Sequence, residues 1–361
     1  MVYDVIIAGA GVTGGMLARE LSKYSLSVCL LEKGNDVALG ASRANSGIVH
    51  GGFDPEPDTL KAKLNVAGVP LLYEAARQLN VPCRQNGSLV LAFGKDEEPA
   101  IHELYERGIA NGVDGMRVLS GDEARAIEPQ LSKEVTLALQ IPSAGIVCPY
   151  ELTVASIGNA MDNGVTLKCN FKVSGIERGD CFTVTAESGE QVQGRYFCNC
   201  AGAYADQIAE LAGDKFYDII PRAGEYMLLD KAEGGLVSHT IFQVPTANGK
   251  GILVSPTVDG NLLTGPTAAV VDEADNTRTT AENLKVVSTL ALKSVPTVNF
   301  RAVITSFSGV RASTKGGDFI IEASKKVDGL VHVAAIDSPG LSSCVAIARY
   351  VVDIWAASAL S

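Results

Sequence analysis

Basic clusters, metal-ligand spacings and long apolar runs are all missing from this sequence. Its 41 acidic residues outnumber 30 basic ones, giving a net charge of −11, so we expect no nucleic-acid partner. No run of about 18 or more apolar residues occurs, which argues against a transmembrane segment. The eight cysteines form no CxxC pair and no metal-binding spacing with the four histidines. The sequence therefore predicts neither a metal centre nor a disulfide framework.

The first residues also lack the pattern of a secretory signal, because Asp4 and a glycine turn interrupt their apolar run. We therefore expect a cytoplasmic protein with free thiols, or one held at a membrane only through a partner. Cys198 and Cys200 flank Asn199, and a core strand is the favoured interpretation over a redox pair. With 361 residues, the chain is long enough for a large core and is expected to form two domains.

The most informative pattern that is present occupies the first 32 residues. An apolar run over residues 2–8 predicts a parallel strand that is covered on both faces. A glycine-rich turn follows at residues 9–14, and apolar residues then recur at helical spacing. A second apolar run ends on Glu32. This order of strand, turn, helix, strand and acid is typical of the βαβ unit that binds a dinucleotide.

Each residue type in the turn has a physical reason. Gly9 permits the tight turn out of the strand, Gly11 lets backbone amides approach a pyrophosphate, and Gly14 lets the helix pack near the strand. The helix that begins at Val12 and Thr13 directs unpaired N–H groups at the phosphates. An ordinary glycine-rich turn without a ligand is the alternative interpretation. The strand before the turn and the acid that closes the unit favour the dinucleotide site over it.

The acid that ends the second strand completes this unit. Glu32 lies about 20 residues past the turn, where a carboxylate accepts hydrogen bonds from both hydroxyls of a ribose and disfavours a 2′-phosphate. Lys33 follows it and is included in the same predicted site. A cofactor of the NAD type remains open at this point, and the colour of the purified protein would distinguish it from a flavin.

A stretch of small and polar residues follows at 40–53. Small residues let the backbone approach a flat ligand, and Ser42, Asn45 and Ser46 can donate hydrogen bonds beside Gly47. A solvated connecting loop is the simpler interpretation. A loop of this length in a compact domain is more often functional, so we predict that it lines the cofactor.

The remaining pattern predicts an α/β fold with a Rossmann-like dinucleotide-binding domain and an inserted, mostly antiparallel β substrate domain of α+β type. A strand that ends on Ala201 and Gly202 predicts a second approach to the cofactor. The nucleotide domain is expected to be discontinuous and the substrate or cap domain to fill its gaps. The nucleotide domain is predicted to comprise residues 1–80, 145–215 and 310–361. The substrate or cap domain is predicted to comprise residues 81–144 and 216–309.

Together these segments resemble flavin-dependent oxidoreductases of the D-amino-acid-oxidase superfamily. Beyond the first turn, the resemblance rests on residues 41–52, Gly202, residues 309–311 and residues 338–341. Two further stretches narrow it to the group of the anaerobic glycerol-3-phosphate dehydrogenase catalytic subunit and the L-2-hydroxyglutarate oxidases. These stretches are residues 221–226 and 249–257.

The resemblance implies non-covalently bound FAD and assigns residues to it by position. Ser42, Asn45, Ser46 and Gly47 would line the flavin, Val173 would contact the adenine, and the start of the last helix would lie at the pyrimidine end of the ring. There the helix dipole would stabilise the reduced anionic flavin. The residues of this helix start are Gly340, Leu341, Ser342 and Ser343.

The resemblance also implies hydride transfer from a small anionic substrate to the flavin. Arg311 is the candidate anion-binding and flavin-site residue, because a guanidinium binds phosphate or carboxylate bidentately; a structural ion pair is its alternative. His50 is the candidate base, with a packed histidine as its alternative. Tyr226 and Lys250 are weaker catalytic candidates. Some relatives carry arginine where this chain has Asp54.

The leading hypothesis is therefore an FAD-dependent dehydrogenase of a 2-hydroxy compound, with glycerol 3-phosphate as the first substrate. L-2-hydroxyglutarate comes second, and oxidation of an amino acid or amine third. A flavoprotein that only carries electrons is the alternative of a different class. A separate electron acceptor, a quinone or an iron–sulfur subunit, is also expected, because this chain lacks the cysteine-rich domain of many such relatives.

Overall fold

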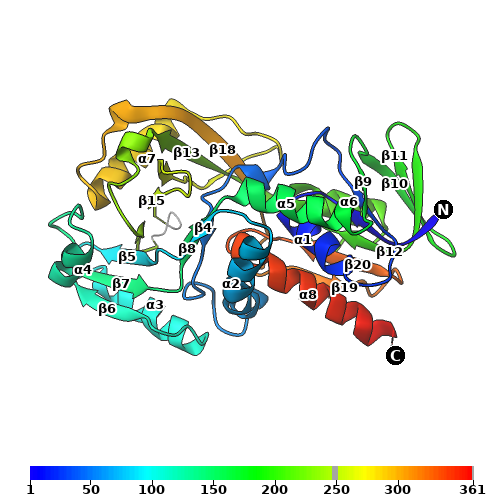
Figure 1. The fold of residues 1–361 in the computed structure, drawn as a ribbon, viewed down its shortest axis with the longest axis horizontal. Coiled ribbons are helices and arrows are strands. Elements are labelled where there is room, and N and C mark those ends of the chain that lie inside the picture. The colour runs from blue at the N-terminus through cyan, green and yellow to red at the C-terminus, as the bar shows by residue number, and fades with distance from the viewer. Residues whose placement is uncertain (246–250, 360–361) are drawn as a thin grey trace.

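The computed structural model describes residues 1–245 and 251–359, and its elements form two large sheets joined by a central region (Figure 1). The first sheet has eight strands, in the order β10-β11-β12-β1-β2-β9, with β20 pairing to β12 and β19 to β20. Their bounds are β1 (Val2–Ala8), β2 (Val28–Leu31), β9 (Thr166–Lys168), β10 (Val173–Arg178), β11 (Phe182–Ala186), β12 (Gln191–Asn199), β19 (Ile320–Ala323) and β20 (Leu330–Ala334).

Parallel pairing dominates the centre of this first sheet. Strand β1 pairs in parallel with β12 and β2, and β12 in turn pairs in parallel with β20. Val5 and Ile7 of β1 pack into one core, whereas Ile6 and Ala8 pack into another on the opposite face. Both faces are therefore covered, which explains why the strand is apolar without alternation.

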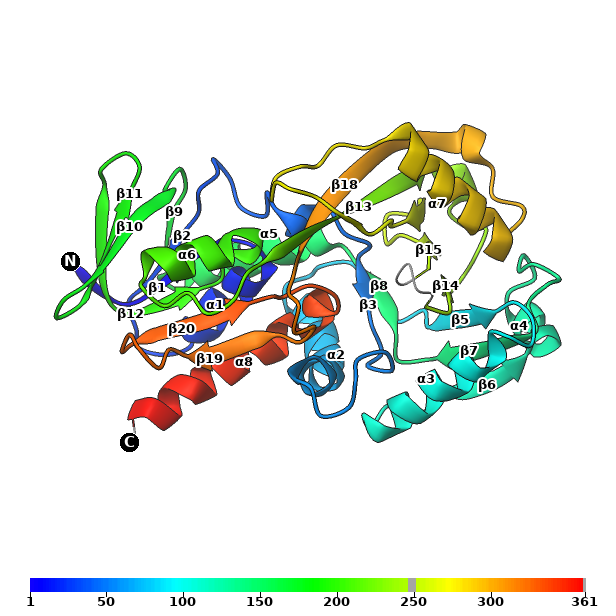
Figure 2. The ribbon, with the colours of Figure 1, turned by 180° about the vertical axis from the view of Figure 1, so that it is seen from behind.

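Helices cover both faces of the first sheet. Helices α1 (Val12–Leu21), α2 (Leu60–Gln78), α5 (Pro149–Asp162) and α8 (Gly340–Ala359) contribute to the larger core, and α6 (Ala205–Leu211) lies on the other face. Figure 2 shows α8 running beneath β19 and β20 towards the C-terminus. Among the residues described, no helix combines the length and the hydropathy that a membrane crossing requires.

The second sheet has nine strands, in the order β17-β13-β16-β15-β14-β5-β7-β6, with β18 also pairing to β13. It is mostly antiparallel, as the sequence predicts; the β14–β5 pair is parallel. The bounds are β5 (Ser88–Ala92), β6 (Arg117–Ser120), β7 (Leu137–Ile141), β13 (Ile220–Leu229), β14 (Thr240–Gln243), β15 (Leu253–Pro256), β16 (Leu262–Gly265), β17 (Ala269–Val270) and β18 (Val303–Ser313).

The two faces of this second sheet have different surroundings. Helices α4 (Gly121–Ile127) and α7 (Ala281–Ser294) pack on one face. Helix α3 (Glu98–Ala110) packs on part of the other face, which we call the inner face. The inner face carries Phe242 of β14 and Leu253 of β15. Strand pairing continues this face through Leu263 of β16 to Leu228 of β13, and so to Tyr226, because directly opposite residues and alternate residues along a strand share a face.

A small three-stranded sheet lies between the two halves. It consists of β3 (Ile48–Val49), β8 (Gly145–Val147) and β4 (Cys83–Arg84), and short 3₁₀ turns occur at Ala41–Arg43 (η1) and Gly202–Tyr204 (η2). The predicted mixed fold of a Rossmann-like sheet and a mostly antiparallel sheet is confirmed. The predicted domain boundary at residue 310 falls inside β18, which pairs with β13 on both sides of that residue. The division into two domains stays a prediction.

Candidate active site

The glycine turn joins β1 to α1 through close backbone contacts. Gly9 has a φ of +104°, and a Cβ there would lie 2.4 Å from the Cys200 carbonyl oxygen. A Cβ at Gly14 would lie 2.0 Å from the Gly9 oxygen. Gly11 is the N-cap of α1, which begins at Val12 and includes Thr13. The turn therefore tolerates no side chain at Gly9 or Gly14, which is the packing that the glycine spacing predicts.

Glu32 lies directly beside this turn. Its Oε2 accepts a hydrogen bond from Ala10 N at 3.0 Å, and its Oε1 accepts one from Gly34 N at 2.8 Å. A carboxylate has about four acceptor sites, so two remain for ribose hydroxyls. Lys33 lies 3.5 Å from the centre of the Tyr204 ring, which brings it to the edge where η2 and Gly202 also lie.

The small-residue stretch folds over the start of α1. Ser42 Oγ accepts a hydrogen bond from Val12 N at 2.9 Å, so this side chain occupies one of the free amides of the helix. Asn45 accepts from Gly47 N at 2.9 Å and donates to Ala41 O at 3.0 Å. Asn45 thus shapes the loop through its own backbone, and the half-buried Ser46 lies inside that bend.

The start of α8 meets β3 and His50 across nearly the whole sequence. The backbone N–H of His50 donates to Ser342 Oγ at 2.7 Å, and Ser342 Oγ donates to Ile48 O at 3.3 Å. Ser338 Oγ lies 3.4 Å from His50 Nε2. Ser342 and Ser343 are fully buried. The structure therefore brings together the predicted base and the start of the last helix, Gly340, Leu341, Ser342 and Ser343.

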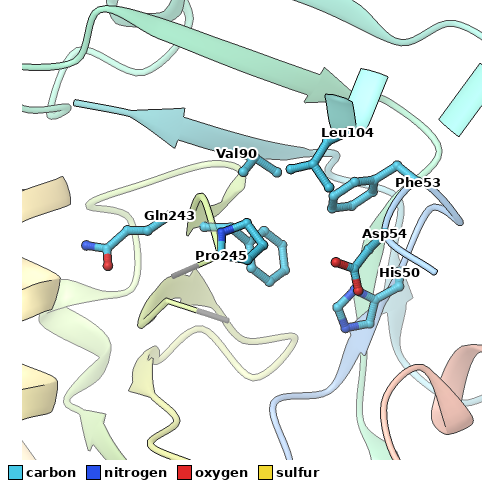
Figure 3. Close-up of a pocket in the computed structure, with 8 residues that line it drawn as sticks. His50, Phe53, Asp54, Val90, Leu104, Gln243 and Pro245 are labelled. Atoms are coloured by element: carbon cyan, nitrogen blue, oxygen red, sulfur yellow. The ribbon is translucent and has the colours of Figure 1, made fainter. Parts of the chain in front are cut away.

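A small pocket opens beside His50. The ring centres of His50 and Phe242 lie 5.7 Å apart. Figure 3 shows His50 and Asp54 together at one end of the pocket and mainly apolar side chains around the rest. The lining residues are His50, Phe53, Asp54, Val90, Leu104, Phe242, Gln243 and Pro245.

Arg311 and Tyr226 lie on the inner face of the second sheet. Arg311 is half-buried, and its Nη1 donates to Thr267 O at 3.5 Å. Its guanidinium forms no ion pair with a carboxylate of residues 1–245 and 251–359. Tyr226 is buried and stacks on Phe307, with ring centres 4.8 Å apart and planes at 13°. The alternative interpretation of Arg311, a structural ion pair, therefore finds no partner among the described residues.

Val173 and His239 lie apart from Arg311 and Tyr226. Val173 begins β10 and, like Ala201, packs against the core on the face of the first sheet that α6 covers. Lys250 lies outside the described residues. His239 Nδ1 lies 2.6 Å from Oε1 of the buried Glu128. Burial acts to raise the pKa of Glu128, but hydrogen bonds from His239 and Ser238 prevail and lower it.

Sequence reasoning missed the residues that hold the loop before α8. Asp337 Oδ1 lies 2.5 Å from Lys61 Nζ, and its Oδ2 accepts from Ser313 Oγ at 2.9 Å. The buried Asn65 amide, oriented to satisfy both groups, bridges His50 O at 3.2 Å and Gly52 N at 2.9 Å. Asn65 is a polar residue among the buried, mainly apolar residues of helix α2, and that position is the signal that could have identified it.

Cys198 and Cys200 lie at the end of β12 with their sulfurs 3.7 Å apart. Both are buried and free, and burial raises the pKa of Cys198 well above its usual value. This agrees with a core-strand interpretation. No group of His, Cys, Asp and Glu within the described ranges could hold a metal ion.

The geometry of the first turn fits a dinucleotide. A Cβ built at Gly202, where φ is +57°, would meet nothing within 4 Å, and the same holds for Gly40. The backbone at Gly11, the Glu32 carboxylate and these open glycines surround one edge of the first sheet, whereas the Val12 amide that the sequence assigned to the phosphates is bound to Ser42 Oγ. Diphosphate, ribose and a flat ring would each find a group of the right chemistry there.

Comparisons with known proteins extend this result to the whole chain. The family model DAO, FAD dependent oxidoreductase, matches residues 4–354. A glycerol 3-phosphate dehydrogenase of Caloramator mitchellensis is 45% identical over 98% of this chain and 73% of its own length. The L-2-hydroxyglutarate dehydrogenase of Pongo abelii is 30% identical over 97% and 87%.

A solved structure gives the same answer at the level of the fold. The L-alpha-glycerophosphate oxidase of Mycoplasma pneumoniae, with FAD bound, superposes with a TM-score of 0.93 at 32% identity, covering 98% of this chain and 94% of the other. The chain therefore belongs to the DAO family of FAD-dependent oxidoreductases, and its cofactor is FAD.

Proposed function

We propose that this protein oxidises glycerol 3-phosphate at its secondary hydroxyl. When bound, FAD supplies the acceptor for the hydride that leaves the substrate carbon. The observation that carries the proposal is the Arg311 guanidinium, which lies half-buried on the inner face without a carboxylate partner among the described residues. Such a group suits the phosphate of the substrate. Relatives with this activity are 33–45% identical over nearly the full chain.

His50 takes the hydroxyl proton in this proposal. Its ring is held between Phe242, at 5.7 Å, and Ser338 Oγ, at 3.4 Å from Nε2. Its backbone N–H donates to Ser342 Oγ at 2.7 Å, which fixes the His50 backbone beside the helix start that would face the flavin. An imidazole titrates near neutrality and can accept the proton as the hydride leaves. Tyr226 and Lys250 stay weaker candidates for contacts to substrate.

Electrons leave the reduced enzyme to a separate acceptor, for which a quinone or an iron–sulfur subunit is proposed. We place the protein in the cytoplasm, or at a membrane through that partner.

Anaerobic mixing of the holoenzyme with each candidate substrate tests the proposal. We expect glycerol 3-phosphate to bleach the flavin absorbance within seconds, and L-2-hydroxyglutarate and glycine to leave it oxidised. Bleaching by L-2-hydroxyglutarate instead would move the activity to that substrate. If no candidate substrate bleaches the flavin, the protein would be an electron carrier and the proposal would be wrong.

Replacing Arg311 by lysine tests the anion-binding role. Lysine keeps the charge but loses the planar fork, so we expect the KM for glycerol 3-phosphate to rise at least tenfold with flavin content unchanged. Steady-state kinetics with an artificial acceptor measure this. Arg117→Lys, on the far strand β6, is the matched control and should leave KM unchanged. An unaltered KM in Arg311→Lys would remove this residue from the site.

A further inference from the structure

Two arginines face each other on the ladder that β13 and β18 form. In its register, Arg222 lies opposite Arg311, Gly224 opposite Gly309, and Tyr226 opposite Phe307. Directly opposite residues of an antiparallel pair point to the same side of the sheet, with Cβ atoms about 4.5–5.5 Å apart. Arg222 therefore shares the inner face with Arg311.

The path of the Arg311 side chain brings the two guanidiniums closer. A Cβ built at Gly224 would lie 2.9 Å from Arg311 Nη2, and Nη1 reaches Thr267 O on the far side of β13. The guanidinium therefore crosses β13 above Gly224. On that strand Arg222 and Tyr226 are the next residues of the same face on either side, because side chains alternate with a period of two. Arg311 thus lies beside Arg222 on one side and the tyrosine on the other.

No described carboxylate neutralises either arginine. Within residues 1–245 and 251–359, neither Arg222 nor Arg311 forms an ion pair, although the chain carries a net charge of −11. Other arginines do have carboxylate partners, namely Arg77, Arg107, Arg125, Arg178 and Arg195. Like charges directly opposite each other destabilise a sheet. A bound anion would remove that cost, and two cations favour an anion with two charges.

We propose that Arg222 joins Arg311 in binding the phosphate dianion of the substrate and so selects dianionic over monoanionic compounds. This inference rests on the proposed function and deepens it. A phosphate monoester presents three oxygens and about two negative charges, enough for two guanidiniums at once. A carboxylate presents two oxygens and one charge, which Arg311 alone satisfies. Arg222 is exposed, so it can turn towards the ligand without unfolding any element.

The test measures binding of inorganic phosphate and of acetate to the holoenzyme at pH 8, followed by the change in flavin absorbance. In Arg222→Gln we expect phosphate to bind at least tenfold more weakly and acetate less than twofold. Arg222→Lys keeps the charge and should recover part of the phosphate affinity. Arg117→Gln removes the same charge from an exposed position on β6, beside Gln140, and should change neither affinity.

Kinetics give a second readout. In Arg222→Gln the KM for glycerol 3-phosphate should rise with the phosphate dissociation constant, while kcat stays within twofold. Equal weakening of phosphate and acetate, or no weakening of either, would overturn the proposal. Flavin content and circular dichroism establish that each variant is folded.

These outcomes separate this inference from the proposed function. If phosphate binding depends on Arg222 but glycerol 3-phosphate fails to reduce the wild-type flavin, the dianion site stands and the proposed reaction is wrong. If glycerol 3-phosphate reduces wild type and Arg222→Gln with the same KM, the reaction stands and the role of Arg222 is wrong.

Discussion

At the scale of single residues, Gly11 tests the nucleotide site most directly. A Cβ there would lie 3.1 Å from Ser42 Oγ, so the two methyl groups of valine would extend into the space before α1. We expect Gly11→Val to retain less than one tenth of the normal flavin, measured by absorbance after purification. The control is Gly158→Ala on α5, where a Cβ meets nothing within 4 Å. Full flavin in Gly11→Val would contradict the assignment of the turn.

A buried histidine predicts a second effect at this scale. His332 is fully buried on β20, with Nε2 3.3 Å from Asp214 Oδ2 and Nδ1 3.0 Å from the Tyr217 hydroxyl. Burial lowers its pKa below the usual 6.5, although Asp214 acts to raise it. The folded state therefore binds this proton less readily than the unfolded chain. Its contribution to stability is present above pH 6.5 and is lost as the pH falls through the lowered value.

We expect His332→Gln to flatten this dependence. Between pH 7.5 and pH 5.5 the Tm of the wild type should fall more than that of the variant, measured by thermal circular dichroism. Asp214 has a lowered carboxyl pKa, since hydrogen bonds from Ser324 and His332 outweigh the effect of burial, and it titrates well below this window. Parallel curves for the two proteins would show that His332 does not titrate there.

At the scale of elements, Glu225 attaches helix α7 to strand β13. This buried carboxylate accepts from Thr280 N at 2.7 Å and from Asn283 Nδ2 at 2.7 Å, at the first turn of the helix. Its neighbours Gly224 and Tyr226 face the opposite side of the strand. One strand thus carries a helix anchor on one face and the predicted substrate surface on the other.

Glu225→Ala should therefore separate stability from cofactor binding. Losing these hydrogen bonds and leaving buried donors unpaired is expected to reduce the free energy of unfolding by about 2–4 kcal/mol. Urea unfolding measures the loss, and the flavin content should stay normal. Glu282→Gln, at an exposed position in the same turn, should cost less than about 1 kcal/mol. Loss of flavin in Glu225→Ala would show that α7 also supports the nucleotide half.

At the scale of the whole molecule, the predicted cofactor site draws on distant parts of the chain. Residues 9–14, 32–33, 42–47 and 340–343 meet only in the folded state. A ligand that binds only the folded state stabilises it by mass action, by about 2.7 kcal/mol at one hundred times its Kd. We expect the Tm to fall when FAD is removed and to rise again as FAD is added. Scanning calorimetry measures this change. A Tm that does not depend on the FAD concentration would contradict the proposal that these segments form one FAD site.

Local pattern predicted much of the architecture. The βαβ unit of residues 2–32, strand β12 over 191–199 and strand β20 over 330–334 follow the apolar periodicity closely. The nearby Ala201–Gly202 step and the helix start at Gly340 were also readable, since caps and glycine turns depend on adjacent residues. By contrast, β13 begins at Ile220, earlier than its pattern indicates, because Pro221, Arg222 and Gly224 interrupt the apolar alternation.

The sequence by itself determined the first turn, its acid and the two-sided burial of the central strands, because these features depend on periods of two or 3.6 residues and on the chemistry of glycine. Only the tertiary structure decided that His50 meets Ser342, that Arg222 faces Arg311, and that Gly224 leaves room for a guanidinium. Strand register and helix docking are set by long-range packing, which no local pattern encodes.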